Sequence, residues 1–111
     1  MTAFRLLLAA MFLVLLGYTA IVIQGHGLNL FAVFFGDMAK LGWPGQFNLD
    51  FMFMLMLSAT WVSWRHRFTP AGLGLGLLAF LGGASFLTVY LLVLTARGAD
   101  LKTILLGPSR V

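Results

Sequence analysis

Three long apolar stretches occupy most of this 111-residue chain. They cover residues 4–24, 47–64 and 70–96, with only short polar segments between them, and predict helices over about residues 4–24, 47–66 and 70–97. A helix needs about 20 apolar residues to cross the ~30 Å hydrocarbon layer of a bilayer, and each stretch is close to that length or exceeds it. Hydrophobic residues make up 61% of the sequence and charged residues 9%, against about 45–50% and about 25% in soluble domains. The chain is therefore predicted to be an all-α integral membrane protein, with three transmembrane helices in one domain over residues 1–111.

A short interfacial helix is predicted over residues 28–41, between the first two stretches. On a wheel of 100° per residue, Asn29, Asp37 and Lys40 gather on one side and apolar residues on the other. The turn-forming residues of Trp43-Pro44-Gly45 predict a break after it. At the other end of the chain, residues 99–106 predict one or two further interfacial turns.

Capping residues predict where the second and third helices begin. Asn48 can cap the second helix, with Asp50 in the first turn, where the helix dipole favours a negative charge. If this helix began earlier, Asp50 would lie deeper and could handle protons or cations. Thr69 and Pro70 predict an N-cap and a proline at the first position of the third helix.

Basic residues lie near the ends of the apolar stretches, where they can meet lipid headgroups. No basic patch forms on one face, so a nucleic-acid partner is not expected. Three straight spans would place the termini on opposite sides of the membrane. The basic residues would then divide almost equally, three against four. Arg5 and the tight Arg65-His66-Arg67 loop favour a cytoplasmic N-terminus, in a bacterial inner membrane.

The chain has no cysteine, which excludes disulfides, thiolate metal sites and cysteine nucleophiles. The first apolar stretch is longer than the 7–15 residues usual for the core of a signal peptide, and no small-x-small cleavage site follows it. We therefore expect the first helix to be retained.

The third stretch carries a stripe of small and aromatic residues. Small residues at spacings of three and four let helix backbones approach closely in a membrane. The stripe therefore predicts either packing within the chain or a docking face for a second copy or another membrane protein. Its members are Gly72, Gly76, Ala79, Gly83, Phe86 and Tyr90.

Other side chains are predicted to anchor the chain at the membrane surface. Tryptophan and arginine are favoured at the headgroup level. The predicted anchors are Trp43, Trp61, Trp64, Arg65, Arg67 and Arg97. His26, between two glycines, is the histidine with better access to a ligand such as a haem or pigment. His26 and His66 cannot hold one porphyrin together from opposite sides, and no metal or cofactor is expected.

The entry to the second helix carries the one resemblance to known proteins. Phe47-Asn48-Leu49-Asp50-Phe51, followed by Trp61, Trp64 and Arg65, resembles uncharacterised small bacterial three-helix inner-membrane proteins. The resemblance covers roughly the C-terminal two-thirds of the chain and implies the same fold, with no established activity.

No set of residues is spaced as catalysis requires, so the chain is not expected to be an enzyme. The sequence favours a non-catalytic accessory or scaffolding subunit of a larger membrane complex, such as an energy-transducing one. The alternative is a homo-oligomeric carrier of ions or small solutes. Its path would be lined by Tyr18, Thr19, Asp50, Ser58 and Thr60.

Overall fold

The computed structural model describes residues 2–111, and every regular element in that range is helical. The prediction of an all-α fold is therefore confirmed. Five α-helices and one 3-10 helix follow in the order α1 (Thr2–His26), α2 (Leu30–Ala39), α3 (Trp43–Arg65), α4 (Pro70–Ala96), α5 (Leu101–Leu106) and η1 (Pro108–Arg110).

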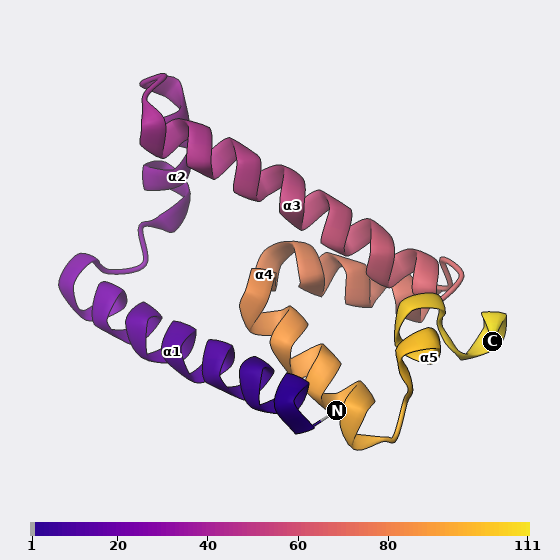
Figure 1. Ribbon diagram of the computed structural model, residues 1–111. Helices are drawn as coiled ribbons and strands as arrows, with labels where there is room; N and C mark the ends of the chain where they lie inside the picture. The colour runs from indigo at the N-terminus through magenta and orange to yellow at the C-terminus, as the bar shows by residue number, and fades with distance from the viewer. Residues whose placement is uncertain (1) are drawn as a thin grey trace.

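The long helices α1 and α3 run in opposite directions, and α4 lies between them (Figure 1). α4 packs against both, whereas α2 packs against the beginning of α3. The connection between α3 and α4 is tight, and α5 lies beside it at the end of α3 (Figure 1). The start of α1 lies near the end of α4, so both termini are at the same end of the molecule.

Helix α4 is broken in its middle, at Gly83. This residue has φ 56° and ψ −138°, a conformation that in practice only glycine adopts. Two arms result, a first arm of residues 70–82 and a second arm of residues 84–96. At 1.5 Å per residue each arm is about 20 Å long, which is too short to cross a bilayer alone.

The two arms of α4 form a sharp bend: the first arm starts near the end of α3, and the second arm runs back to end beside the start of α1 (Figure 1). His66 contacts both arms. Its Nε2 atom is 2.6 Å from the hydroxyl of Tyr90, and a Cβ added to Gly72 would lie 2.5 Å from the Cβ of His66. In a straight helix Gly72 and Tyr90 would be about 27 Å apart. The predicted helix over residues 70–97 is therefore present as α4, but it is sharply bent at Gly83.

Helix α3 begins four residues earlier than predicted. Its N-cap is Gly42, in an extended conformation, and Pro44 lies in the first turn, where the missing N–H does no harm. Asn48 is thus inside the helix and does not cap it; its amide donates a hydrogen bond to the carbonyl oxygen of Phe34 in α2 (3.1 Å). Asp50 lies about two turns into α3, with its side chain exposed. The predicted N-cap at Thr69 is confirmed, since its side chain accepts a hydrogen bond from the Gly72 N–H.

The chain leaves an unusual amount of apolar surface uncovered. Its accessible surface is 7732 Å², whereas a compact globular protein of this mass has about 6,000 Å². Among residues 2–111, four hydrophobic residues are buried: Leu8, Val62, Ala79 and Ile104. By length and composition alone, α1 and α4 are apolar enough to cross a membrane, whereas α3 does not meet that criterion.

The two halves of α1 differ in their surroundings. In the first half, Leu8 is buried and Ala9, Phe12 and Leu15 are partly covered, which is the side that packs against α4. Every residue from 16 to 33 is exposed. The second half of α1 therefore has no buried residue, and α2 covers it only in part, on the side of Val22 (39% exposed) and Ile23 (41%).

Candidate functional site

Arg65, the last residue of α3, is a buried arginine that is 2% exposed. Its guanidinium donates three hydrogen bonds. Nε donates to the carbonyl oxygen of Ile104 (2.7 Å), one terminal nitrogen to that of Thr103 (3.0 Å), and the other to the hydroxyl of Tyr90 (3.0 Å). All three acceptors are neutral. Burying a charge is costly unless it is hydrogen-bonded, so carbonyl and hydroxyl dipoles stabilise this cation in place of a carboxylate.

Helix α5 is held at its C-terminal end. The last four carbonyl groups of a helix have no partner inside it, and a six-residue helix is marginal by itself. Side chains of α3 and η1 donate to all four. The acceptors are Thr103 and Ile104 for Arg65, Leu105 for the indole N–H of Trp61 (3.0 Å) and Leu106 for Arg110 (3.3 Å). A positive guanidinium at this end also complements the helix dipole.

Tyr90 links Arg65 to His66. The Tyr90 hydroxyl accepts a hydrogen bond from Arg65, so its own proton is available to His66 Nε2, 2.6 Å away. This network assigns His66 as the neutral tautomer with an unprotonated Nε2. Partial burial, and then the positive charge of Arg65, lower the pKa of His66 below its ordinary value of 6.5. Both effects favour the neutral imidazole that the hydrogen bond requires.

A second set of contacts holds η1 against the α3–α4 connection. Arg67 donates from Nε to the hydroxyl of Ser109 (2.8 Å) and from a terminal nitrogen to the Ser109 carbonyl (3.2 Å). Arg110 lies over the ring of Trp64, 4.0 Å from its centroid, and donates to the Trp64 carbonyl. We call these contacts between residues 61–67 and residues 103–110 the tail clamp. Its side chains are those of Trp61, Trp64, Arg65, Arg67 and Arg110.

The small residues of the predicted stripe lie between the first arm of α4 and α3. Gly72, Gly76 and Ala79 are all buried. A Cβ added to Gly76 would lie 3.0 Å from the Ala59 carbonyl oxygen and would overlap the hydroxyl of Ser63. This face is used inside the chain, which corrects the alternative that it docks a partner.

The rest of the stripe does not continue along the same face, because the helix breaks at Gly83. Gly83 lies against Phe51 and Leu55 near the middle of α3. Phe86 and Tyr90 belong to the second arm, where their rings stack with centroids 5.6 Å apart. Tyr90 thus lies next to the tail clamp, where its hydroxyl contacts Arg65 and His66, and it does not continue the stripe of small residues.

The predicted surface anchors have different environments. Trp43 is 73% exposed at the start of α3, and Arg67 and Arg97 are exposed at the opposite end of the molecule. Trp61 and Trp64 take part in the tail clamp. Arg65 is not a headgroup anchor as predicted, because its guanidinium is turned inward to the carbonyls of α5.

His26 lines a cavity of about 600 Å³ between the end of α1 and α2. Most of the lining is apolar, and Thr19 and Asn29 are the other polar side chains. Within residues 2–111, no group of three or more His, Cys, Asp or Glu side chains could hold a metal ion. Ligand binding by His26 stays a prediction.

Sequence reasoning missed the tail clamp. It expected one or two interfacial turns over residues 99–106, and α5 does form there, started by the Asp100 side chain, which accepts a hydrogen bond from the Thr103 N–H (2.9 Å). One feature of the sequence could have indicated the tail clamp: Arg65 lies at the end of an apolar helix, and no acidic residue is spaced to pair with it. Such an arginine needs carbonyl acceptors from elsewhere in the chain.

No protein-family model, curated protein or solved structure matches this chain.

Proposed function

We propose that this chain is a small, non-catalytic integral membrane protein of the bacterial inner membrane. In this proposal it serves as an accessory or scaffolding subunit of a larger membrane assembly, such as an energy-transducing complex. The observation that carries the proposal is the exposure of every residue from 16 to 33. A helix half that is largely uncovered by its own chain is available to a neighbour.

The exposed apolar side chains support a membrane location. They lie on all the long helices, for example Val14 (72% exposed), Leu57 (67%) and Leu81 (64%). In water this surface would be a strong drive to aggregate, whereas lipid chains solvate it without cost. The molecule is 45 Å along its longest axis, close to the ~40–45 Å of a bilayer with its headgroups.

The folded-back α4 supports a topology with two spans. In this topology α1 and α3 cross the bilayer. α4 is more apolar than α3, but it enters only to the middle, because the bend at Gly83 divides it into two arms that are each too short to span. Backbone that is not helical, as at Gly83, is tolerated at that depth where protein covers it, and here Phe51 and Leu55 do so. The three straight spans expected from the sequence are replaced by two spans and a re-entrant helix.

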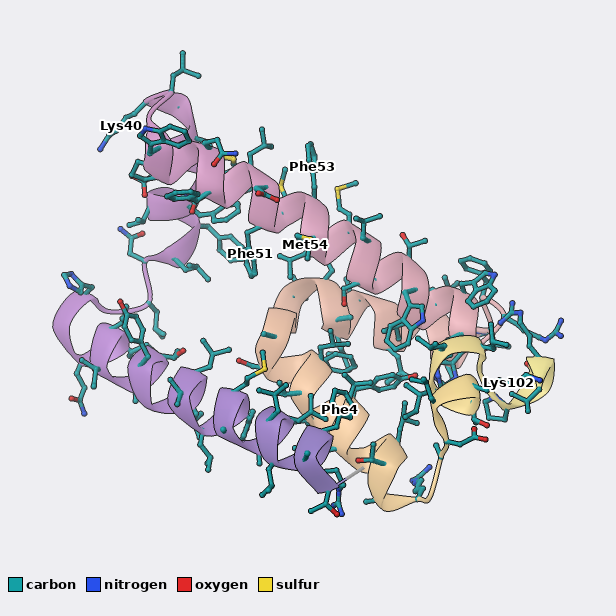
Figure 2. All side chains as sticks on the ribbon, in the orientation of Figure 1. Phe4, Lys40, Phe51, Phe53, Met54 and Lys102 are labelled. Carbon is teal, nitrogen blue, oxygen red and sulfur yellow. The ribbon has the colours of Figure 1, made fainter. Side chains whose placement is uncertain are left out.

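The charges are distributed unequally between the two ends of this fold. Six of the seven basic residues lie at the end that holds both termini, with one aspartate, which makes a net charge of +5. The opposite end has Lys40 with Asp37 and Asp50, a net charge of −1; Figure 2 shows Lys40 and Lys102 at these opposite ends. Basic residues favour the cytoplasmic side, so we place both termini in the cytoplasm.

Polar groups on the uncovered half of α1 support a protein neighbour. Tyr18, Thr19 and Gln24 are all exposed there. The Thr19 hydroxyl is bonded to its own helix, at the carbonyl of Leu15 (2.7 Å). A glutamine amide facing lipid is unfavourable, and helices in membranes associate partly through such groups. A helix of another subunit packed here would satisfy it.

Site-specific photo-crosslinking in the native membrane tests this proposal. A photoreactive residue at Ile21, which is 70% exposed, is expected to capture a different, larger membrane protein. The matched control is Leu81, which is 64% exposed on α4, and which is expected to capture less or none. Capture of lipid alone at Ile21, with recovery of the chain only as a stable monomer in mild detergent, would contradict the proposal.

The alternative, a homo-oligomeric carrier, has one observation in its favour. Asp50 is exposed about two turns into α3, and carboxylates inside membranes are often functional. Against it, the hydroxyls of Thr19 and Thr60 are bonded to their own helices (2.7 and 2.8 Å). Capture of a second copy at Ile21, with proteoliposome flux that is lost in Asp50→Asn, would favour the carrier instead.

A further inference from the structure

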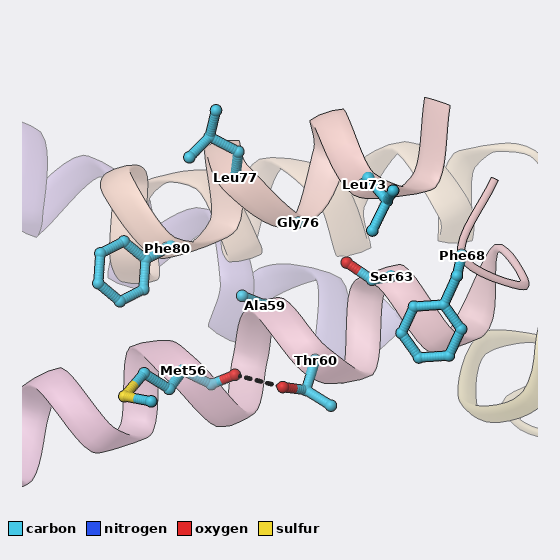
Figure 3. Close-up of a pocket in the computed structure, with 9 residues that line it drawn as sticks. All are labelled: Met56, Ala59, Thr60, Ser63, Phe68, Leu73, Gly76, Leu77 and Phe80. Carbon is cyan, nitrogen blue, oxygen red and sulfur yellow. Dashed lines mark hydrogen bonds between the residues drawn. The ribbon is translucent and has the colours of Figure 1, made fainter. Parts of the chain in front are cut away.

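A shallow, open groove lies between α3 and the first arm of α4 (Figure 3). It has a volume of about 370 Å³, and Phe68 lies at the end nearest the α3–α4 connection (Figure 3). Met56, Leu73, Leu77 and Phe80 supply most of the remaining apolar lining.

The polar groups of this groove already have partners. The Thr60 hydroxyl donates to the Met56 carbonyl (2.8 Å), and the Ser63 hydroxyl donates to the Gly72 carbonyl (3.4 Å). The groove therefore offers an occupant almost no free hydrogen-bonding groups along its length. An alkyl chain matches this surface better than a polar ligand or a polar helix face.

A positive charge held in place belongs to the chain neighbour of Phe68, which lines one end of the groove. Arg67 precedes Phe68 in the chain, and its guanidinium is held by two hydrogen bonds to Ser109. Guanidinium has five N–H donors, so three remain for another acceptor. An arginine already fixed in place binds a phosphate with a smaller loss of side-chain entropy.

The backbone at this point is strained. Arg67 and Phe68 have φ values of 57° and 54°, a region that residues other than glycine rarely adopt. Hydrogen bonds from the Arg67 N–H to the Trp64 carbonyl (2.9 Å) and from the Phe68 N–H to the Ser63 carbonyl (2.8 Å) hold the conformation. Strain of this kind gathers at binding sites, where the surrounding structure maintains it. Here the strained backbone places the ring of Phe68 in the groove, and Phe68 directly follows Arg67 in the chain.

From these observations we propose that the groove and Arg67 bind one anionic phospholipid. The phosphate accepts hydrogen bonds from the Arg67 guanidinium, and one acyl chain lies along the groove past Phe68 and Leu77. Trp64, 36% exposed beneath Arg110, lies in the same region and suits the headgroup level. This inference rests on the proposed membrane location, and it adds a specific lipid to it.

Native mass spectrometry of the full chain in mild detergent tests the site, with phosphatidylglycerol and phosphatidylcholine added at equal concentration. The protein is expected to retain one phosphatidylglycerol in preference to phosphatidylcholine. Arg67→Gln is expected to reduce the retained phosphatidylglycerol about tenfold, the effect of losing one charge-assisted contact. Leu77→Trp, which fills the groove, is expected to do the same.

Two matched variants distinguish this site from general attraction. Arg97→Gln removes an exposed cation away from the groove, and Leu81→Trp enlarges a residue of similar exposure on the same arm that does not line it. Both are expected to retain the lipid. Equal retention of the two lipids, or equal loss in Arg67→Gln and Arg97→Gln, would overturn the proposed site. Extraction of the protein from membranes by alkaline carbonate would instead refute the membrane location itself.

Discussion

At the scale of single residues, the unusual feature is Arg65, a buried cation whose hydrogen-bond acceptors are all neutral. The cost of burying Arg65 is offset because a guanidinium can donate in several directions at once, here to two helices. Arg65 also donates hydrogen bonds to carbonyl groups at the C-terminal end of α5. The cost of burying the guanidinium and the cost of leaving these carbonyls without donors are thus offset by the same hydrogen bonds. Arg65 is therefore expected to determine whether the C-terminal segment is folded.

Substitution of Arg65 should destabilise the protein strongly. Arg65→Ala leaves the Ile104 carbonyl without its donor and the Thr103 carbonyl with only the Gly107 N–H (2.8 Å). We expect a loss of about 3 kcal/mol in unfolding free energy. Arg65→Lys keeps the charge but cannot donate in three fixed directions, so its loss should be smaller but clear. Thermal unfolding in detergent measures both, with exposed Arg97→Gln as a control expected to change little. Equal stability of Arg65→Ala and the parent protein would contradict the clamp.

The attachment of the tail should weaken as the pH falls. The pKa of His66 is lowered in the folded state by burial and by Arg65, so its contribution to stability is fully present above about pH 6.5 and is lost as the pH falls through the lower folded value. Protonation puts a second cation beside Arg65 and removes the acceptor of the Tyr90 proton. Asp100, whose pKa is lowered mainly by its hydrogen bond to Thr103, keeps its contribution above about pH 3.8 and loses it only below that value.

Limited proteolysis at Lys102 between pH 8 and pH 5 measures this effect, with a protease whose own activity is calibrated at each pH. Cleavage is expected to speed up below about pH 6.5 in the parent protein and in His26→Gln. His66→Gln should show nearly the same rate throughout. A parent protein whose cleavage rate does not change with pH would refute the role assigned to His66.

At the scale of elements, one residue decides the shape of α4. The two arms can fold back because Gly83 adopts a conformation closed to other residues. The first arm then packs its small residues on α3, and the second arm returns beside Trp61 and Arg65 through Tyr90.

Replacing Gly83 by alanine should therefore be costly. The new Cβ would be strained at φ 56° and would lie 3.2 Å from the Phe51 ring and 3.3 Å from a Leu55 methyl. We expect a loss of about 1–3 kcal/mol, seen as a lower Tm in detergent. Gly74→Ala is the matched control: its Cβ would meet nothing within 4 Å, so it should be neutral or slightly stabilising. A Gly83→Ala protein as stable as Gly74→Ala would argue for a straight α4.

The sequence was sufficient to predict the long helices but not the break at Gly83. Apolar length predicts α1, α3 and α4 within a few residues, and Thr69-Pro70 locates the start of α4. Gly72, Gly74, Gly76, Gly82 and Gly83 look alike in the sequence, and only the neighbours Phe51 and Leu55 distinguish the glycine that bends. The acceptors of Arg65 could not be predicted from the sequence either, because two of them are backbone carbonyls about 40 residues away along the chain.

At the scale of the whole molecule, the folded-back α4 changes the topology. A straight α4 would carry the C-terminal segment to the opposite side from the N-terminus. The cavity lined by Phe4 of α1, Trp61 of α3, and Leu91, Ile104 and Leu105 instead brings the start of the chain together with its end.

Cysteine labelling can test this topology directly, because the chain has no cysteine of its own. Single cysteines at Thr2 and Ser109 are expected to react with a membrane-impermeant maleimide only from the cytoplasmic side. A cysteine at Leu41, which is 92% exposed, should react only from the other side. Labelling of Ser109→Cys and Leu41→Cys from the same side would show that α4 crosses the membrane.

The bend at Gly83 also has a consequence for how such a chain is made. In the proposed topology α4 turns back at mid-depth, so the charged residues that must be exported during synthesis are only Asp37, Lys40 and Asp50, at and near the connection between α1 and α3. Lys40 would then be the one basic side chain moved across, and the arginines that follow α3 would remain on the side where the ribosome releases them. The tail can therefore close on Arg65 after insertion is complete, without waiting for any export step.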